Sequence, residues 1–451
     1  MKRLHLLLLL PGLVILGLLV SPVLASLAGI PGEVRLFPGT EFSLSVQLPL
    51  RLIDGDGLDV TGPKGEFFVK AEQVGKQYFQ VRLFGFIPVR ELVVDVVPEV
   101  EVFPGGHSIG VLVNPIGLMI SRIVPVRGVD GQEYYPAAEA GLQPGDVIIS
   151  IGGREVSRPE QVGQIVNELA ADSPQLQIVI QRNDTRLNTT ITPVLSIQED
   201  LRGNQREVYL LGVFLEDPAS GVGTLTFFDK NTKRYGALGH TITDGLGRSL
   251  EITDGTIVSA SIESVKQGLR GLPGEKLGVF LDHTVMGTID KNSKFGIFGS
   301  LTEDLENPFF KSPIPIALNH EVKVGPAKIY TVVDGSRIQE FDVEITRVYH
   351  QSKPADKGMI IRVVDPELLQ KTGGIVQGMS GSPIVQNGKL VGVITHVFVN
   401  DPRMGYGGFI EWMVYESGIS GEVPTSEYSF IVANQIRFSE SVRFFLQENK
   451  V

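Results

Sequence analysis

The chain contains no cysteine, so it can form no disulfide bond and has no thiol nucleophile. It has no HExxH motif and no cluster of cysteine and histidine at metal-ligand spacing, so nothing supports a metal site. Positive charge is also scarce. The formal net charge is −11 at pH 7, which gives no sign of the basic face that nucleic acid requires. A lone Gly221-Val222-Gly223 lacks the rest of a dinucleotide fingerprint. We therefore expect no cofactor, no metal and no nucleic-acid partner.

What the sequence does contain is a serine flanked by glycines, in the run Gly378-Met379-Ser380-Gly381-Ser382-Pro383. A hydroxyl that attacks a carbonyl needs a tight backbone whose N–H groups face the developing oxyanion, and glycine permits such a backbone. The pattern resembles the nucleophile loop of chymotrypsin-like peptidases. It predicts Ser380 as the nucleophile and the N–H groups of Gly378 and Ser380 as the oxyanion hole. The alternative is a simple turn between two strands.

A serine nucleophile needs a base, and the chain has seven histidines. His240 is the first choice because it follows the small-residue run 236–239, which lets the backbone pack closely and brings an imidazole to a strand end. His283 and His396 are the runners-up. His396 comes just after the apolar run that follows Ser380, where it could line a substrate pocket or simply pack.

The carboxylate that would orient the imidazole is harder to choose. Asp365 is the first choice because it follows a β-like run, 359–364, and lies close to Ser380 in the chain. An equally weighted alternative is that Asp365 caps a helix, since proline follows it at what would be the first helical position. The other candidates are Asp244, Asp282 and Asp290.

The order of these groups along the chain is His, Asp, Ser, as in chymotrypsin-like enzymes. In that fold, however, the aspartate lies in the first barrel beside the histidine, whereas Asp365 would lie beside the serine. Either the architecture is a variant or another residue is the acid.

With these motifs, most of the chain resembles the stage IV sporulation protein B peptidases of endospore-forming bacteria. The residues that carry the resemblance are Gly236–His240, Asp365-Pro366 with Thr372–Pro383, and Gly405-Tyr406-Gly407 followed by Ile410-Glu411-Trp412. The resemblance implies that His240 is the base, Asp365 the acid and Ser380 the nucleophile. It also implies an exported signalling serine endopeptidase of sporulation. Such an enzyme cleaves itself and a membrane-bound regulator between the two forespore membranes, which leads to maturation of a sigma factor.

The N-terminal sequence is typical of an exported protein. Lys2 and Arg3 precede an apolar run from Leu6 to Leu24, which is long enough to span a bilayer. Residues 1–26 are predicted to be a signal peptide or a membrane anchor, with the basic end in the cytoplasm and the remainder outside it. The enzyme would then contact the membrane through this segment.

Residues 100–196 resemble a PDZ domain of bacterial exported proteases, on the signature Pro136–Ile148 followed by Ile151-Gly152-Gly153. The helical spacing after Pro159 predicts the helix that closes the peptide groove. A PDZ ligand adds as an extra strand, and main-chain N–H groups hold its terminal carboxylate. We expect that loop at Ser108-Ile109-Gly110-Val111. Its sequence departs from the commonest form, so a free carboxylate and an internal segment both stay open as ligands. The alternative is a PDZ fold that serves as a rigid spacer.

The remaining segments complete the predicted architecture. Residues 27–99 alternate in the β manner and predict a small β-sandwich or a strand-rich spacer, residues 206–417 predict an all-β peptidase domain, and residues 418–451 form a tail. The fold class is therefore mainly β: a variant chymotrypsin-like double β-barrel, preceded by a PDZ domain and a small N-terminal β domain. The competing function is a non-catalytic scaffold whose PDZ domain binds a membrane partner.

Overall fold

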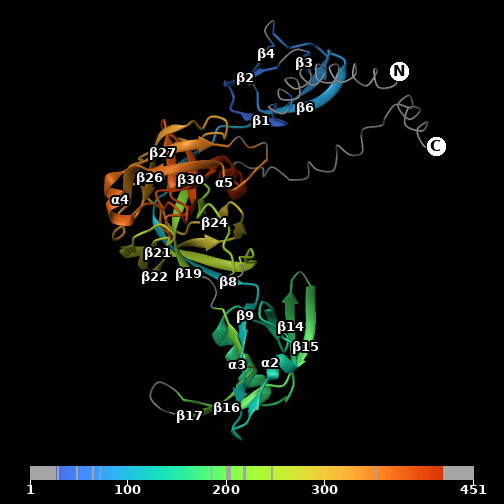
Figure 1. Ribbon diagram of the computed structural model, residues 1–451, viewed down its shortest axis with the longest axis vertical. Helices are drawn as coiled ribbons and strands as arrows, with labels where there is room; N and C mark the ends of the chain where they lie inside the picture. The colour runs from blue at the N-terminus through green and yellow to red at the C-terminus, as the bar shows by residue number, and fades with distance from the viewer. Residues whose placement is uncertain are drawn as a thin grey trace, which may run out of the picture.

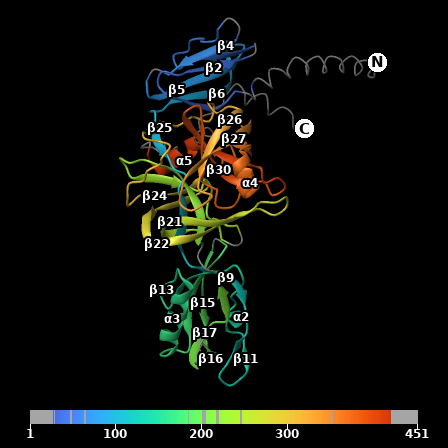
Figure 2. The same ribbon diagram turned by 90° about the vertical axis from the view of Figure 1, so that its left-hand side faces the viewer.

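The computed structural model describes residues 27, 30–46, 49–62, 65–71, 73–183, 185–199, 205–216, 220–244, 247–349, 351 and 353–419, except for the side chains of residues 114–115, 199, 220, 253 and 282–284. The predicted signal or anchor, 1–26, lies outside these residues, as does most of the tail. No helix in this part of the chain is long and apolar enough to cross a membrane. Three bodies lie in a row, with the N-terminal strands at one end, the PDZ module at the other and the peptidase domain between them (Figure 1, Figure 2).

The N-terminal body is β-rich, and two sheets enclose its core. The larger sheet has the order β1-β6-β5-β3, in which β1 and β6 are parallel, and β2 pairs with β4 in the smaller one. The predicted alternation is present: Phe42 and Leu44 of β2 pack on the same buried cluster as Phe67 and Val69 of β4. The strands are β1 (Glu33–Leu36), β2 (Glu41–Ser45), β3 (Leu50–Ile53), β4 (Glu66–Lys70), β5 (Gly75–Leu83) and β6 (Ile87–Val96).

The first half of the peptidase domain is a strongly curled sheet of order β22-β21-β8-β19-β20-β24-β23. Its ends approach each other, because Gly287 of β22 bridges to Leu301, beyond β24, and the Thr302 N–H donates to the Met286 carbonyl at 2.9 Å. The strands are β7 (Glu101–Pro104), β8 (Ser108–Pro115), β19 (Ser220–Phe228), β20 (Arg234–Ala237), β21 (Ile252–Lys266), β22 (Glu275–Ile289), β23 (Lys291–Ser293), β24 (Gly296–Ser300) and β25 (Ile314–Pro315).

The second half is a closed six-stranded barrel of order β26-β27-β28-β31-β30-β29. Its apolar runs fill one large buried core, and helix α5 follows the last strand directly. The mainly β, double-barrel prediction for this domain is confirmed. The elements are β26 (Gly325–Thr331), β27 (Gln339–Val348), β28 (Met359–Val363), α4 (Pro366–Thr372), β29 (Pro383–Gln386), β30 (Lys389–Val397), β31 (Met404–Phe409) and α5 (Ile410–Ser417).

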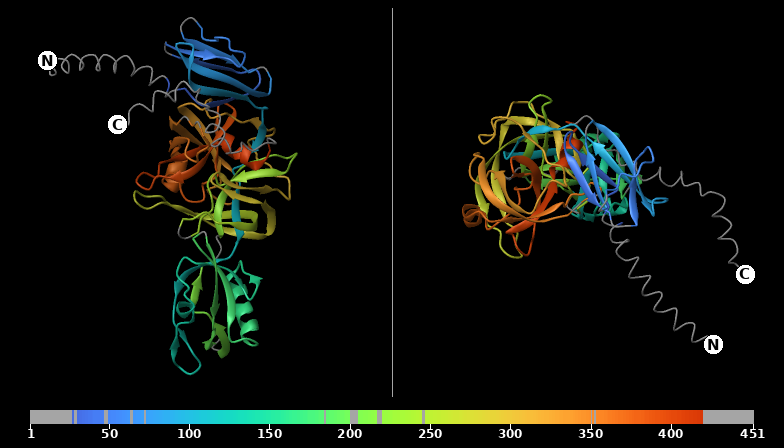
Figure 3. Two further views of the ribbon diagram at one scale, coloured as in Figure 1. Left: turned by 90° about the vertical axis from the view of Figure 1, so that its right-hand side faces the viewer. Right: turned by 90° about the horizontal axis from the view of Figure 1, so that it is seen from above.

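The PDZ module does not simply precede the peptidase domain, because it is inserted into the first barrel. Strand β8 belongs to that barrel and pairs with β19, with Leu112 opposite Ser220 and Ser108 opposite Thr224. The chain thus leaves the barrel after β8, forms the module and returns to pair with β8 again (Figure 3). The predicted range 100–196 thus includes β8, which lies in the peptidase sheet, and omits Val213–Leu215, which pairs with a strand of the module. Alternation in a strand shows which face is buried, but it does not show which distant strand is the partner.

Within the module, a sheet of order β15-β14-β12-β9-β18 packs against helix α3 around its own core. The predicted groove helix after Pro159 is present as α3. The elements are β9 (Leu118–Ile123), β10 (Val126–Arg127), β11 (Glu133–Tyr134), α2 (Pro136–Glu139), β12 (Val147–Ile151), β13 (Arg154–Glu155), α3 (Pro159–Ala170), β14 (Leu176–Arg182), β15 (Thr185–Ile191), β16 (Val194–Glu199), β17 (Gln205–Leu210) and β18 (Val213–Leu215).

A buried ion pair joins the N-terminal body to the peptidase domain. Arg35 of β1 donates to the Glu411 carboxylate of α5 at 3.1 Å, and Glu411 is fully buried. The second Glu411 oxygen accepts the Asn319 N–H at 2.8 Å and the Asn319 side-chain amide at 2.9 Å. Burial raises the pKa of Glu411, and Arg35 and Asn319 oppose that rise. The pair thus lies across the contact between the two bodies, and Asp95 and Glu33 lie farther from the Arg35 guanidinium, at 3.7 and 3.8 Å.

Glu411→Ala should lower the free energy of unfolding by about 3–5 kcal/mol, because it removes the buried carboxylate closest to Arg35 and leaves only the more distant Asp95 and Glu33. The single tryptophan, Trp412, reports this site, since the Arg35 guanidinium lies 5.3 Å from its ring centroid. Urea unfolding followed by its fluorescence measures the effect. Glu367→Ala is the control, because Glu367 pairs with Lys371 on the exposed surface of α4. An equal, small change in both variants would contradict the role of the buried pair.

Candidate active site

The loop that carries Ser380 is anchored to strand β19 of the other barrel. The Thr224 N–H donates to the Ser380 carbonyl at 3.0 Å, and Thr224 Oγ1 donates to the Gly378 carbonyl at 2.8 Å. Gly381 makes this approach possible, because its φ is +98° and a Cβ there would overlap the Thr224 carbonyl oxygen. Any other residue at 381 would push the loop off the first barrel.

The two predicted oxyanion donors are oriented through the carbonyl groups of their own peptide bonds. The Gln377 carbonyl accepts the Lys276 N–H at 2.9 Å, and the Met379 carbonyl accepts Ser382 Oγ at 2.6 Å. In a trans peptide the N–H points opposite to the C=O, so these bonds fix the N–H groups of Gly378 and Ser380. Among the described residues neither N–H has an acceptor, so both are available to an oxyanion.

His240 lies at the end of β20, after two residues with left-handed backbone, Leu238 (φ 70°) and Gly239 (φ 73°). Its Nδ1 is 2.8 Å from the Thr241 carbonyl oxygen. A carbonyl can only accept, so Nδ1 carries the hydrogen and Nε2 is left as the acceptor, which is the tautomer of a general base. Burial lowers the pKa of His240 below its ordinary value of 6.5, so the imidazole is neutral at pH 7.

His240 and Ser380 converge on strand β30. Ser380 Oγ donates to the Thr395 carbonyl at 2.7 Å. A Cβ on Gly239, the residue before the histidine, would lie 3.1 Å from the Thr395 side chain. Ser380 and His240 form no hydrogen bond with each other in this structure. The hydroxyl must therefore leave Thr395 before it can donate to the imidazole, as is common in unliganded active sites.

A second imidazole lies beside the first. The rings of His240 and His396 are 5.2 Å apart, centroid to centroid. Burial lowers the pKa of His396, the neighbouring His240 lowers it further, and Asp356 acts in the opposite direction. Sequence analysis named His396 only as a runner-up and did not name Asp356, which lies three residues before β28.

The structure does not bring Asp365 to the imidazole. One of its carboxylate oxygens accepts the Leu368 N–H at 2.9 Å as the N-cap of α4, and the other faces the Asp342 N–H at 3.3 Å. The alternative interpretation, a helix cap followed by proline, is confirmed. In the usual triad a carboxylate accepts the hydrogen bond from Nδ1 of the histidine. Here the Thr241 carbonyl accepts that bond from His240.

The other candidate residues lie as follows. Asp290 pairs with Arg234, and Asp244 pairs with Arg248 at 2.7 Å. The side chains of Asp282 and His283 lie outside the described part of the chain. No group of three carboxylates and histidines among the described residues could hold a metal ion.

The predicted position of the carboxylate loop of the PDZ module is wrong. The sequence analysis places that loop at Ser108-Ile109-Gly110-Val111. These residues form the first half of β8, between β19 and β21 of the peptidase domain. A Cβ at Gly110 would lie 2.6 Å from the Phe280 ring, so this glycine serves close packing. Both edges of the strand are already paired, so it cannot bind a peptide.

A buried lysine that the sequence did not single out packs behind the nucleophile loop. Lys276 is 2% exposed, and a Cβ on Gly378 would lie 3.1 Å from its side-chain carbons. Its Nζ donates to Thr331 Oγ1 at 2.8 Å. Burial lowers the pKa of Lys276 to about 7. Its stem therefore fills the space beneath the oxyanion loop, and no carboxylate within the described residues pairs with its charge.

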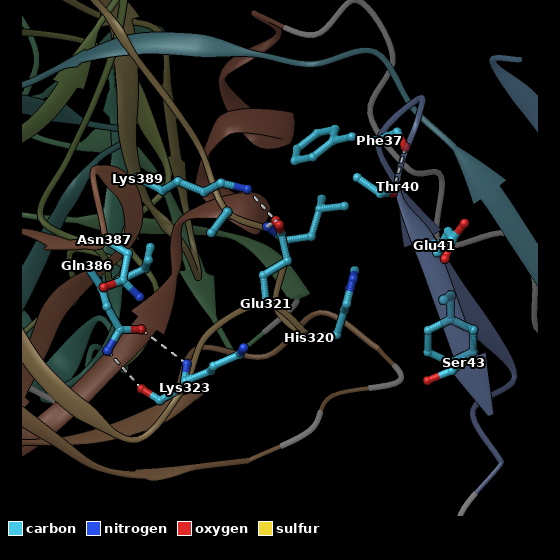
Figure 4. Close-up of a pocket in the computed structure, with 14 residues that line it drawn as sticks. Phe37, Thr40, Glu41, Ser43, His320, Glu321, Lys323, Gln386, Asn387 and Lys389 are labelled. Carbon is cyan, nitrogen blue, oxygen red and sulfur yellow. Dashed lines mark hydrogen bonds and ion pairs between the residues drawn. The ribbon is translucent and has the colours of Figure 1, made fainter. Parts of the chain in front are cut away.

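A separate cavity of about 530 Å³ lies between β2 of the N-terminal body and the second barrel (Figure 4). Its wall includes the Lys389–Glu321 ion pair and His320, whose ring meets that of Phe42 edge-on at 6.3 Å. None of the predicted catalytic residues lines it. It is therefore distinct from the site at β30.

Comparison with known proteins matches two segments of the chain. The profile of the SpoIVB peptidase S55 family matches residues 207–414, and a PDZ-domain profile matches residues 129–182. The chain therefore carries a serine peptidase domain with a PDZ module. The family match begins inside the segment that returns from the module, so it does not reveal that β8 is part of the peptidase fold.

Curated relatives match shorter stretches. A putative zinc metalloprotease, mll0638, of Mesorhizobium japonicum is 37% identical over 78 residues, 17% of this chain and 21% of that protein. A probable periplasmic DegP-like serine endoprotease of Pseudomonas putida is 25% identical over 173 residues, 38% of this chain and 30% of that protein. The chain thus spans less than a third of the length of these relatives. The active form of the Rv3671c protease from M. tuberculosis aligns with 46% of this chain and 76% of its own, at 15% identity and a TM-score of 0.25.

Asp365→Asn should leave the reactivity of Ser380 close to that of the wild type, because asparagine also caps helices. Asp365→Ala should lower stability by about 0.5–2 kcal/mol through loss of the cap. The rate of Ser380 labelling by a fluorophosphonate and the thermal unfolding midpoint measure the two effects. A loss of about 10⁴-fold in rate for Asp365→Asn, with unchanged stability, would instead make Asp365 the catalytic acid.

Lys276→Met should stabilise the protein by roughly 1–4 kcal/mol at pH 6, because it removes a buried, unpaired charge. The folded-state pKa is below that of the unfolded chain, so the wild type gains stability as pH rises from about 7 towards 10.5. The advantage of the variant should shrink over the same range. Urea unfolding at pH 6, 8 and 10 measures it, and a constant difference between the two proteins would contradict this account.

Proposed function

We propose that this chain is a serine endopeptidase with Ser380 as its nucleophile and His240 as its general base. His240 Nε2 takes the proton from Ser380 Oγ as the hydroxyl attacks the scissile carbonyl. The N–H groups of Gly378 and Ser380 stabilise the oxyanion, and an acyl-enzyme forms. The imidazolium then gives its proton to the leaving amine, and water, activated by the same histidine, hydrolyses the ester.

One observation carries this proposal. The His240 ring lies 5.2 Å from that of His396 in β30, and Ser380 Oγ donates to the carbonyl of the preceding residue, Thr395, although His240 and Ser380 are 140 residues apart in the chain. In this arrangement the Thr241 carbonyl holds Nδ1, the atom that a carboxylate holds in the usual triad. A carbonyl dipole stabilises the imidazolium less than a full negative charge does. The proposed enzyme is consequently slower in its resting form than a complete triad.

We further propose that this activity serves export-coupled signalling during sporulation. The match to the SpoIVB peptidase S55 family and the similarity to a periplasmic serine endoprotease support a site of action outside the cytoplasm. On this proposal the enzyme cleaves its own N-terminal part and then a membrane-bound regulator, which leads to sigma-factor maturation. The N-terminal apolar segment, 1–26, would present the enzyme at the membrane.

Replacement of Ser380 tests the activity. Ser380→Ala should abolish fluorophosphonate labelling and all self-processing fragments of the full chain, whereas Ser312→Ala should retain both. Ser312 is the control because it is an exposed serine outside the nucleophile loop. Labelling by mass-tagged probe and N-terminal sequencing of the fragments are the measurements. Equal fragment patterns in wild type and Ser380→Ala would favour the non-catalytic scaffold.

The pH dependence tests the base. The rate of Ser380 labelling should rise along an acid limb whose midpoint lies below 6.5, because burial lowers the pKa of His240 and only the neutral imidazole accepts a proton. His396→Gln should keep this limb, since His396 is the neighbour and not the base. A limb that vanishes in His396→Gln would transfer the role of base to His396.

A further inference from the structure

We propose that the tip of the β5–β6 hairpin, residues 82–90, binds an anionic lipid bilayer as a membrane contact separate from the N-terminal segment 1–26. Arg82 and Arg90 enclose seven uncharged residues in this hairpin tip, and all of them except Gly85 are apolar. The hairpin belongs to the N-terminal body, which forms one end of the molecule (Figure 2). Lipid binding of this kind does not depend on the proposed peptidase activity.

The hairpin tip projects beyond the core of its body. Leu92 is the first residue of β6 that is buried in this core. Residues 87–89 are all exposed, although neighbours along a strand face opposite sides of the sheet. In the turn, Phe84 and Phe86 are 61% and 68% exposed, and their rings stack with 6.2 Å between centroids. A contiguous apolar surface of this kind marks a site of contact with a protein or a membrane.

The turn keeps a phenylalanine at a position that disfavours it. Phe84 and Gly85 both have left-handed backbone, with φ of 54° and 81°. The Phe86 N–H donates to the Leu83 carbonyl at 3.3 Å and closes the turn around them. Asparagine, aspartate and glycine favour the first of these two positions, because a bulky side chain is strained there. The exposed ring of Phe84 gains no burial in return, and such a conflict with local preference is typical of a functional position.

Arginines lie at the base of the hairpin tip. Arg82 of β5 is directly opposite Arg51 of β3, a pairing of like charges that destabilises a sheet. Arg51 pairs with Asp59 at 2.7 Å. Among the described residues, Arg82 and Arg90 donate to neutral oxygens and form no ion pair. Aromatic side chains in front of unpaired arginines match the boundary of a bilayer, where the rings lie at headgroup level and the cations meet anionic lipids.

The predicted membrane segment enters the body at the same end. Leu27 is the first described residue, and Arg90 Nη1 donates to its carbonyl at 2.7 Å. Strand β1 is parallel to β6, with Glu33 opposite Val93, so the chain before β1 lies on the side of the hairpin tip. A bilayer that received the apolar residues 6–24 would therefore lie next to the tip. This position favours a bilayer over a second copy of the chain as the partner.

Two membrane contacts on one body have a consequence that, unlike lipid binding itself, rests on the proposed self-cleavage. Removal of a single anchor would release the enzyme from the membrane, whereas the hairpin tip would continue to hold it reversibly. The Arg35–Glu411 pair lies across the contact between this body and the peptidase domain. The cleaved enzyme would therefore stay at the membrane that holds its proposed substrate.

Sedimentation of the full chain with lipid vesicles tests the proposal. The chain carries Ser380→Ala, which keeps it whole, and Leu13→Arg/Leu18→Arg, which place two charges in the apolar run so that it cannot span the bilayer. This parent chain should bind vesicles of phosphatidylcholine with phosphatidylglycerol more tightly than vesicles of phosphatidylcholine alone. Equal binding to the two kinds of vesicle would overturn the proposed preference for an anionic bilayer.

Replacement of the two rings tests the hairpin tip itself. Phe84→Asn/Phe86→Thr should weaken binding to the anionic vesicles at least about tenfold, because two phenyl rings no longer leave water. Leu58→Ser is the matched control and should bind as the parent chain does. Leu58 is also exposed, but it lies in the turn after β3, which runs away from the tip. Equal binding of all three proteins would overturn the proposal.

The same variant separates loss of the rings from misfolding. Asparagine favours left-handed backbone, so Phe84→Asn should keep or raise the thermal unfolding midpoint while vesicle binding falls. Loss of binding together with a lower midpoint would mean that the whole body had changed, and it would count against the hairpin tip as the binding element.

A dye at the tip identifies what covers it. The chain has no cysteine, so Ile87→Cys in the parent chain accepts a single polarity-sensitive NBD label, and Asp56→Cys, in the exposed turn after β3, is the control. With anionic vesicles, the emission of the label at 87 should shift to the blue and be quenched by a quencher within the bilayer, whereas the label at 56 should not respond.

The label without vesicles decides between the bilayer and other partners. Its emission at 87 should then be that of a dye in water. Blue-shifted emission that grows with protein concentration would make a second copy the partner. Blue-shifted emission at every concentration would mean that another part of the chain covers the tip. Either result would overturn the proposal.

Discussion

The contact between Thr224 and the nucleophile loop is the interaction on which the rest of the site depends. One residue of the first barrel fixes two carbonyl groups, those of Gly378 and Ser380, in a loop of the second. The oxyanion donors of the same loop are oriented because their peptide planes are anchored by Lys276 and Ser382. If the two barrels did not approach each other at Gly381, the loop that carries Ser380 would not be held in a catalytic geometry.

Strand β19, which carries Thr224, is also the strand at which the chain re-enters the barrel after the PDZ module. Insertion into a barrel, rather than attachment at its end, means that the module has two covalent connections to the peptidase fold, one to β8 and one to β19. These two strands are paired with each other, so both connections are short and converge.

The electrostatic design of the site relies on burial rather than on ion pairs. His240 is kept neutral by burial and its tautomer is selected by a backbone carbonyl, while Lys276 is buried behind the oxyanion loop with a single hydroxyl partner. His396 adds a second neutral imidazole at the same edge. The carboxylates nearby serve structure instead, as Asp365 does at the start of α4. A low-dielectric site strengthens each remaining dipole that faces the substrate.

The local chemistry of the chain could be inferred from its sequence. A glycine loop around Ser380, a histidine after a small-residue strand, an Asp-Pro helix start and the PDZ signature are short-range patterns, and each is found where local backbone preferences put it. What the sequence did not contain is pairing between strands far apart. Strand β8 alternates in the same way whichever sheet it joins, so its assignment to the PDZ module was wrong.

Tertiary structure alone decided which groups meet. It placed His240 and Ser380 beside neighbouring residues of β30, His396 and Thr395, kept Asp365 on α4, put Lys276 behind Gly378 and paired residues 213–215 with β9. The physical reason is that side-chain types and local periodicity are properties of neighbours in the chain, whereas strand register and close approach are settled by packing of the whole core.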